Sequence, residues 1–320
     1  MTDHEGLSQK RWPLFFYKVV SRIYQRKKGP QNIGFGKWLP KIQHHVGYCW
    51  LLSVQLHAYN ERRSQHCVVF GVNAMIVFDS VYMNFGRKTP FTDHRKPVLR
   101  GIDFHLKRGE ILCLLGPSGC GKTTMVNLIM GRLLPSSGTV TVMGERAPYK
   151  TVRKKIGYMP QEDALYTDIT AIDNLKFFGK MNGMPAGQVR QRANEMLRFG
   201  LLEEDARKKV SDFSGGMKRR LSLGIAMMHE PDLLILDEPT VGLDPEHRRR
   251  IWMEFERLAS NGCTILVTTH VMDEAARCSL IAMLNEGRFV ASGSPDQILE
   301  ETGAKDLEDA FLKLEGGDRK

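Results

Sequence analysis

The chain has 320 residues, of which 42% are hydrophobic and 26% charged, and its formal net charge at pH 7 is +10. This length suits about two domains, or one large α/β domain with an appendage, and the composition excludes a disordered chain, a collagen and a disulfide-rich mini-protein. Residues 1–70 hold 11 Lys and Arg against 3 Asp and Glu, whereas residues 71–320 hold 35 against 33. The positive charge therefore belongs to the N-terminal segment.

Residues 1–70 form a basic, poorly periodic N-terminal extension. Its aromatic and basic stretch 12–24 could lie as an amphipathic helix on an anionic membrane surface. A loosely ordered tail is the alternative. Gly and Pro residues after position 28 break the rest into loop-like pieces.

From position 74 onward, strand patterns alternate with helical ones. Segments 74–85 and 97–106 alternate in polarity and are expected to pair as antiparallel strands. Further strands are expected at 110–115, 138–142, 155–158, 232–236, 263–268, 279–284 and 288–291. A helix is expected at 122–133, and residues 168–213 are helical, with Pro185 at a helix start and Gly200 at a helix stop. We predict an α/β fold over residues 71–320, with a mostly parallel core sheet, an N-terminal antiparallel β-subdomain and a helical subdomain at about 165–230.

The loop after segment 110–115 matches the phosphate-binding pattern G-x-x-x-x-G-K-[ST], and it lies between a strand and a helix, as that pattern requires. Its glycines let consecutive N–H groups point toward one anion, and the helix that follows adds its positive end. Lys122 supplies charge to the β- and γ-phosphates, and the Thr123 hydroxyl can ligate Mg²⁺. The fold is therefore predicted to be a P-loop NTPase. The predicted nucleotide-binding residues are Gly116, Pro117, Ser118, Gly119, Cys120, Gly121, Lys122, Thr123 and Thr124.

Two acids follow the apolar segment 232–236, which is apolar on both faces, as a buried parallel strand is. Ligands of open α/β sheets collect at the carboxyl ends of the strands, so Asp237 suits Mg²⁺, directly or through water. Glu238 would face the γ-phosphate and take a proton from, or orient, the attacking water. Alone, such a pair is often only a solvated strand end; downstream of a complete phosphate loop it predicts a metal ligand and a base.

Four further motifs stand in a fixed order around these two. Residues 213–217 read Phe-Ser-Gly-Gly-Met, Gln161 follows Gly-Tyr-Met-Pro, Asp244 ends Gly-Leu-Asp, and His270 ends Val-Thr-Thr-His. Together the motifs resemble those of ATP-binding cassette (ABC) ATPases over about residues 74–314. In that family they are the signature motif, the Q-loop, the D-loop and the switch histidine. The signature keeps Ser-Gly-Gly but has Phe and Met where the family usually has Leu and Gln.

The resemblance implies a role for the signature residues in a second molecule. Ser214, Gly215 and Gly216 open a helix with a capping Ser and two residues without side chains, which makes an anion-binding helix N-terminus. In the family, this end contacts the γ-phosphate held by the opposite cassette, so that two ATP molecules are sandwiched between two head-to-tail cassettes. Asp244 is expected to join these nucleotide-binding residues.

The remaining motif residues are implied to act within their own cassette. Gln161 would sense Mg²⁺ and water at the hinge to the helical subdomain, and thus joins Thr123 and Asp237 as a metal-associated residue. His270 would contact the γ-phosphate. Phe85 stands where an aromatic ring stacks on adenine, although Phe85 or the nearby Tyr82 could instead belong to the core. The predicted catalytic residues are Glu238, His270, Gln161 and Lys122.

The implied function is hydrolysis of ATP to ADP and phosphate, coupled to export by an ABC transporter. The sequence is most similar to cassettes of the A and H exporter subfamilies and of bacterial drug or lipid exporters. No apolar run reaches the roughly 18 residues of a membrane span, so a transmembrane permease, either a further domain or a separate subunit, is expected to hold the cassette at the cytoplasmic face of a membrane. The transported substrate is not indicated.

Two alternatives remain at this point. The first is a soluble ABC ATPase that acts on RNA or DNA, which a single cassette and the 92 positions between Lys122 and Ser214 disfavour, since that spacing holds only a compact subdomain. Nucleic acid is accordingly not an expected partner. The second is a catalytically inactive regulatory cassette, which the intact Lys122, Asp237, Glu238 and His270 disfavour.

Overall fold

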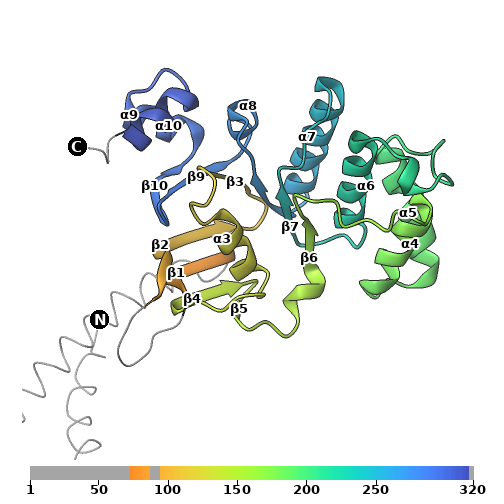
Figure 1. Ribbon diagram of the computed structural model, residues 1–320, viewed down its shortest axis with the longest axis horizontal. Helices are drawn as coiled ribbons and strands as arrows, with labels where there is room; N and C mark the ends of the chain where they lie inside the picture. The colour runs from red at the N-terminus through yellow and green to blue at the C-terminus, as the bar shows by residue number, and fades with distance from the viewer. Residues whose placement is uncertain (1–72, 87–93, 317–320) are drawn as a thin grey trace, which may run out of the picture. The chain divides into compact units, whose positions relative to one another are not determined.

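The computed structural model describes residues 73–86 and 94–316 (Figure 1). The expected membrane-surface helix at 12–24 and the domain boundary near residue 70 lie outside these ranges and stay predictions. Within the described ranges, no helix combines the length and apolar character needed to cross a bilayer.

The first sheet is antiparallel throughout and has the order β2-β1-β4-β5. Its long strands, β1 (Ala74–Phe85) and β2 (Lys96–Lys107), pair as expected because their apolar side chains alternate with polar ones. β4 (Ser137–Val142) lies on the other edge of β1, and the short β5 (Glu145–Arg146) follows it. The sequence pattern had indicated the strands, but not that β4 joins this sheet.

The second sheet is the mostly parallel core, with the order β10-β9-β3-β8-β7-β6. Only the β9–β10 pair is antiparallel; every other neighbouring pair in this sheet is parallel. Each residue of β3 is buried, as a strand with neighbours on both edges and helices near it requires. The bounds are β3 (Ile111–Leu115), β6 (Ile156–Met159), β7 (Leu233–Asp237), β8 (Thr264–Thr268), β9 (Leu280–Asn285) and β10 (Arg288–Gly293).

The helices form two groups. α4, α5 and α6 pack on one another in the connection between β6 and β7, and they form a separate cluster at one end of the fold (Figure 1). The others connect or flank the core strands. The bounds are α3 (Lys122–Ile129), α4 (Ala171–Met181), α5 (Ala186–Phe199), α6 (Gly215–Met227), α7 (Pro245–Ser260), α8 (Met272–Ala275), α9 (Pro295–Thr302) and α10 (Leu307–Gly316), with 3₁₀ turns at Val152–Lys155 and Val210–Asp212.

Helix ends follow the sequence signals, with one exception. Pro185 and Gly200 lie at the two caps of α5, as expected. The helix expected at 122–133 ends at Ile129, because Gly131 takes a φ of 63° there and lies against the ring of Tyr149, where an added Cβ would come within 2.6 Å. A tertiary contact, which the local pattern does not contain, sets that end.

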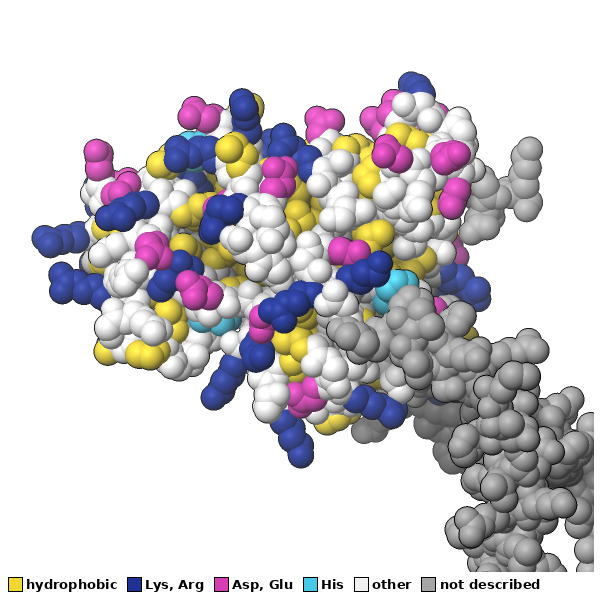
Figure 2. Space-filling view, turned by 180° about the vertical axis from the view of Figure 1, so that it is seen from behind, with side chains coloured by type: hydrophobic (Ala, Val, Ile, Leu, Met, Phe, Trp, Pro, Cys, Tyr) yellow, Lys and Arg dark blue, Asp and Glu magenta, His cyan; other side chains and the backbone are white. Residues whose placement is uncertain are grey.

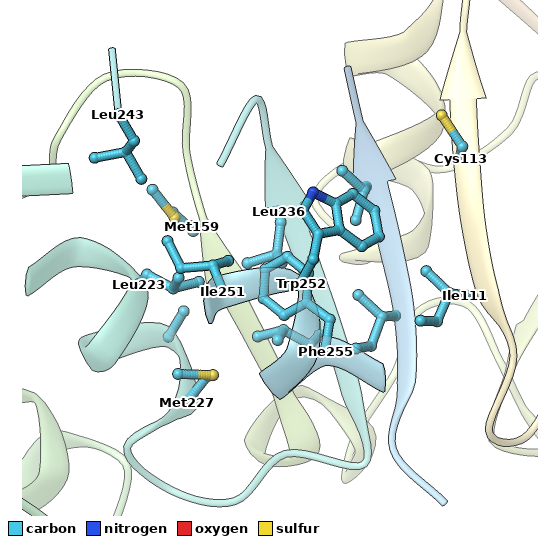
Figure 3. Close-up of a cluster of buried hydrophobic side chains, with 14 of the residues drawn as sticks. Ile111, Cys113, Met159, Leu223, Met227, Leu236, Leu243, Ile251, Trp252 and Phe255 are labelled. Atoms are coloured by element: carbon cyan, nitrogen blue, oxygen red, sulfur yellow. The ribbon is translucent and has the colours of Figure 1, made fainter. Parts of the chain in front are cut away.

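The core sheet separates two hydrophobic clusters, and β3 contributes to both by alternation. Ile111, Cys113 and Leu115 face the cluster that includes α7, whereas Leu112 and Leu114 face the cluster shared with β1, β2 and α3. Figure 3 shows the first cluster, where the rings of Trp252 and Phe255 pack edge to face with centroids 5.4 Å apart. The strand that leads to the phosphate loop is thus fixed from both sides.

Candidate active site

The core sheet brings the predicted site residues to one edge. Parallel strands β3, β8 and β7 are neighbours, with Leu114 opposite Thr268 and Asp237 opposite the same residue. The phosphate loop follows β3, Glu238 follows β7, and His270 comes two residues after β8. Residues far apart in the sequence therefore meet where the strands end, as expected for a ligand site of an α/β sheet.

The phosphate loop is folded so that side chains cannot replace its first glycine. Gly116 has a φ of 152°, and a Cβ there would lie 2.2 Å from the carbonyl oxygen of Leu284 and 2.7 Å from Cys120 Sγ. Lys122 Nζ donates to the carbonyl oxygens of Gly116 and Pro117 at 2.6 and 3.1 Å. The loop thus curls around the ammonium group, which leaves a positive charge in the concavity where phosphate is expected.

Helix α3 presents an uncapped N-terminus to this loop. Its N-cap residue is Gly121, no side chain accepts a hydrogen bond from its first turn, and its first turn contains no acid. The first N–H groups of a helix have no intrahelical acceptor and carry the positive end of the helix dipole, so they suit a phosphate. A triphosphate therefore fits the donor set of this end.

A pocket of about 300 Å³ opens beside the loop. Its lining combines the loop with residues that follow β7 and β8 and with two apolar side chains from α8 and α10. The lining residues are Leu115, Gly116, Pro117, Ser118, Lys122, Glu238, Thr269, His270, Met272 and Phe311.

Glu238 lines this pocket and contacts two polar side chains, His270 inside the lining and Gln161 outside it. Its Oε2 accepts from Gln161 Nε2 at 3.4 Å, and its Oε1 lies 3.3 Å from His270 Nδ1. Its backbone is in the left-handed region, with a φ of 50°, and its N–H donates to the carbonyl oxygen of Thr268 at 2.9 Å. A left-handed backbone at a residue other than glycine costs free energy, so the surrounding structure must hold Glu238 in this conformation. Asp237, one residue earlier, accepts a hydrogen bond from the Thr268 hydroxyl.

The predicted residues of the signature motif and the D-loop are not brought to this pocket. Ser214, Gly215, Gly216 and Asp244 are absent from its lining. The Ser214 hydroxyl accepts from the N–H of Met217 at 3.3 Å, which caps α6.

Asp244 instead caps α7. It accepts from the N–H of His247 at 3.0 Å, and the two side chains meet at 2.5 Å. The hydrogen bonds from His247, led by that of its backbone N–H, lower the pKa of the Asp244 carboxyl below its ordinary value. Phe85 also lies outside the pocket lining, at the end of β1, with 42% of its surface exposed. Thr123 and Thr124 lie in the first turn of α3 and do not line the pocket either.

One residue that the sequence analysis missed is Arg219 of α6. Its buried guanidinium donates to the carbonyl oxygens of Pro160 and Gln161 at 3.2 and 2.8 Å. It also donates to the carbonyl oxygens of Asp237 and Glu238. Arg219 thereby joins the helix of the signature motif to both sides of the site. A charged residue on the buried face of that helix was the available signal.

Comparisons with known proteins identify the family of this chain. Residues 99–241 match the family model described as ABC transporter. The chain is 42% identical, over 74% of its length and 77% of the relative, to Nod factor export ATP-binding protein I of Paraburkholderia xenovorans (strain LB400). It is 40% identical, over 72% of each, to linearmycin resistance ATP-binding protein LnrL of Bacillus subtilis (strain 168). The chain belongs to the ABC transporter ATP-binding family.

Solved structures of ABC cassettes share this fold. The ATP-binding subunit of an ABC transporter superposes with a TM-score of 0.68 at 28% identity, over 75% of this chain and 99% of the other. A dimeric ATP-binding cassette in a post-hydrolysis state, bound to ADP and Pi, gives a TM-score of 0.63 at 26% identity, over 69% of this chain and 98% of the other. The resemblance and the fold class expected from the sequence are thus confirmed, and this ABC cassette is an ATPase.

Proposed function

We propose that this ABC cassette is the ATP-hydrolysing subunit of an exporter, in which a dimer of cassettes couples hydrolysis to transport. The observation that carries the catalytic part is the convergence of Gln161 and His270 on Glu238 beside the phosphate loop. The names of the relatives, which refer to Nod factor export and to linearmycin resistance, support the exporter class. The transported substrate is left unassigned.

Binding of the nucleotide rests on the loop and on α3. Lys122 exchanges its contacts with Gly116 and Pro117 for the β- and γ-phosphates, and the N–H groups of the loop and of the first turn of α3 surround them. The Thr123 hydroxyl, the Asp237 carboxylate and the Gln161 amide oxygen would hold Mg²⁺, since these are oxygen ligands of the kind Mg²⁺ prefers. When bound, Mg²⁺ supplies charge neutralisation to the phosphates. Phe85 stacking on adenine stays a prediction.

Hydrolysis is assigned to Glu238, which orients the attacking water and takes its proton. The left-handed backbone at this residue, fixed by the N–H bond to Thr268, holds the carboxylate toward the pocket. His270 Nδ1 restrains the carboxylate from one side and Gln161 from the other. Because phosphoryl transfer needs little covalent participation by protein, positioning and charge account for most of the catalysis.

A second cassette completes each site. The N-terminus of α6 is capped by Ser214 and uncovered at Gly215, which supports contact of Ser214, Gly215 and Gly216 with a nucleotide held by another cassette. The same contact is proposed for Asp244. The dimeric cassette bound to ADP and Pi, which has the same fold, supports this arrangement. Each chain would contribute a phosphate loop to one nucleotide and a signature motif to the other.

The expected permease would dock on an aromatic cluster of the helical group. The ring centroids of Tyr166 and Phe177 lie 4.9 Å apart, and those of Phe177 and Phe178 lie 5.3 Å apart. Tyr166, Phe177 and Met181 are 51%, 41% and 65% exposed. This cluster begins five residues after Gln161, so a partner bound there would be coupled to the Glu238 site through a short segment of chain.

The cassette would lie at the cytoplasmic face of a membrane through that permease. Contact of residues 12–24 with an anionic membrane surface stays a prediction. The face in Figure 2 mixes Lys and Arg with Asp and Glu, a pattern that does not favour a nucleic-acid partner.

The variant Glu238→Gln tests the proposal. It should bind ATP with an unchanged Kd, lose turnover by about 100-fold or more, and accumulate a nucleotide-bound dimer, because an amide cannot accept the proton. ATP hydrolysis, ATP titration and size-exclusion chromatography with ATP measure these outcomes. Glu301→Gln, an exposed acid of α9, is the matched control. Undiminished hydrolysis by Glu238→Gln would refute the role of Glu238.

A further inference from the structure

Glu274 is a buried carboxylate that the proposed mechanism does not use. It lies on the short helix α8, four residues after His270, and only 1% of its surface is exposed. A buried charge is costly unless hydrogen bonds and an opposite charge compensate for it. The hydrogen-bond and charge partners of Glu274 therefore indicate its role.

Each oxygen of this carboxylate accepts from a different buried hydroxyl. Oε1 accepts from the Thr240 hydroxyl, and Oε2 accepts from the Thr269 hydroxyl at 2.8 Å. Thr240 and Thr269 are 2% and 4% exposed, so water does not compete for these bonds. The opposite charge comes from Arg248 of α7, whose Nε lies 3.8 Å from Oε1.

These partners belong to the two segments that carry the proposed base and the switch histidine. Thr240 comes two residues after Glu238, and Thr269 immediately precedes His270. The Thr269 hydroxyl also accepts from the N–H of Val271 at 3.1 Å, which fixes the backbone on the far side of His270. One carboxylate thus connects the segment after β7 to the segment after β8.

We propose that Glu274 is a positioning residue, which sets the separation of Glu238 and His270 by holding Thr240 and Thr269. The two site side chains lie 3.3 Å apart, and Glu274 itself does not line the pocket. A misplacement of about 1 Å in a reacting group can cost about 100-fold in rate. This inference rests on the roles proposed for Glu238 and His270.

The sharpest variants remove one hydroxyl at a time and keep the shape of the side chain. Thr240→Val and Thr269→Val should each lower kcat by about 10-fold or more. Thr240→Val should also leave the Kd for ATP within about 3-fold, because Thr240 does not line the pocket. Thr240→Val/Thr269→Val should cost less than the product of the single effects, since both substitutions break the same connection. Glu274→Gln should lower kcat in the same way.

A matched control, Thr264, lies at the start of β8, the strand that ends just before Thr269. The Thr264 hydroxyl is equally buried and accepts from the N–H of Gly109 at 3.0 Å, away from the pocket. Thr264→Val should keep the kcat of the wild type, although it also loses a buried hydrogen bond. Thr240→Ser, which retains the hydroxyl, should restore the kcat that Thr240→Val loses.

The readout separates positioning from a merely structural role. Melting temperatures are measured for every variant, and kcat is expressed per folded molecule. Valine variants with lower melting temperatures but wild-type kcat would overturn the proposal, as would fully multiplicative effects on kcat. Glu238→Gln is assayed in parallel: if it hydrolyses ATP normally, the proposed function fails, whereas if it is inactive and the valine variants are fully active, only the role of Glu274 fails.

Discussion

Helices α3 and α6 each have a glycine at or next to their first residue, and each N-terminus is a predicted anion site. The two N-termini differ in what surrounds them. α3 starts after Gly121 with no side-chain cap, and a Cβ on that glycine would come within 2.8 Å of Leu99. α6 starts after Ser214, which supplies its own cap, and nothing lies within 4 Å of the position that a Cβ on Gly215 would take. The first end is enclosed by its own chain, whereas the second is open.

The difference supports the proposal that the two helix ends bind phosphate in two ways, α3 within one chain and α6 between two chains. An enclosed end has its donors arranged by packing, so it can hold an anion within one chain. The N-terminus of α6 is uncovered, so a phosphate held by a second molecule could approach it. A substitution at the N-terminus of α3 should therefore weaken ATP binding, whereas one at the N-terminus of α6 should lower hydrolysis without changing ATP binding.

The largest effect is expected at the enclosed end. Gly116→Ala would place a Cβ 2.2 Å from the carbonyl oxygen of Leu284, so the loop or β9 must shift. We expect the Kd for ATP to rise by about 100-fold or more and the free energy of unfolding to fall by about 1–3 kcal/mol. Titration with a fluorescent ATP analogue and thermal denaturation measure both. An unchanged Kd would show that the loop is not the tight cradle described above.

The open end should tolerate a methyl group in the isolated chain. Gly215→Ala should keep the Kd for ATP and leave the unfolding free energy unchanged or raise it by up to about 1 kcal/mol, because a glycine is replaced without a clash. Hydrolysis should nevertheless fall by about 10–100-fold, since the methyl group would stand between α6 and a phosphate brought by the partner.

A mixing experiment sharpens this second prediction. Gly215→Ala keeps its phosphate loop, and Lys122→Ala keeps its signature motif, so a heterodimer of the two has one intact composite site. Mixed subunits should hydrolyse ATP faster than either variant alone, as measured by phosphate release against mixing ratio. A mixture no faster than the sum of its parts would argue that each chain acts alone.

The smallest effect, on the pH dependence of stability, is expected from His229, which follows the C-terminal end of α6. Burial lowers the pKa of His229 below its ordinary value, and its Nε2 lies 3.2 Å from the carbonyl oxygen of Ile156. The unfolded chain therefore takes up a proton first as the pH falls below about 6.5, so stability is lost between that pH and the lower pKa of the folded state. His229→Gln should lose less melting temperature than the wild type between pH 7.5 and 5.5. An equal loss would remove His229 from the acid response.

Much of the fold could be predicted because its signals are local. The alternation in Ala74–Phe85 and the apolar run before Gly116 indicate strands. The phosphate-loop pattern between a strand and a helix predicts the fold class without any knowledge of tertiary contacts. The early end of α3 could not be predicted, because Gly131 lies against Tyr149 from a distant turn.

The site residues could be predicted where they belong to a local sequence motif, and could not be predicted elsewhere. Gln161, Glu238 and His270 were named from motifs, and the sheet brings them together. Arg219 and Glu274 were missed because most of their hydrogen-bond partners are carbonyl oxygens and hydroxyl groups of other segments, which leave no spacing pattern in the sequence. The burial of a charged residue on an amphipathic helix was the available signal for Arg219.

The position of β3 in the sheet has a consequence for synthesis of the chain. This strand carries the phosphate loop, yet its neighbours β8 and β9 are translated about 150 residues later, which at about 5–20 residues per second is a delay of roughly 8–30 s. During that interval five apolar residues and two strand edges are unpaired on the ribosome, a state that chaperones protect. The phosphate loop can therefore reach its packed conformation, in which Gly116 lies against Leu284 of β9, only after β9 has been synthesised.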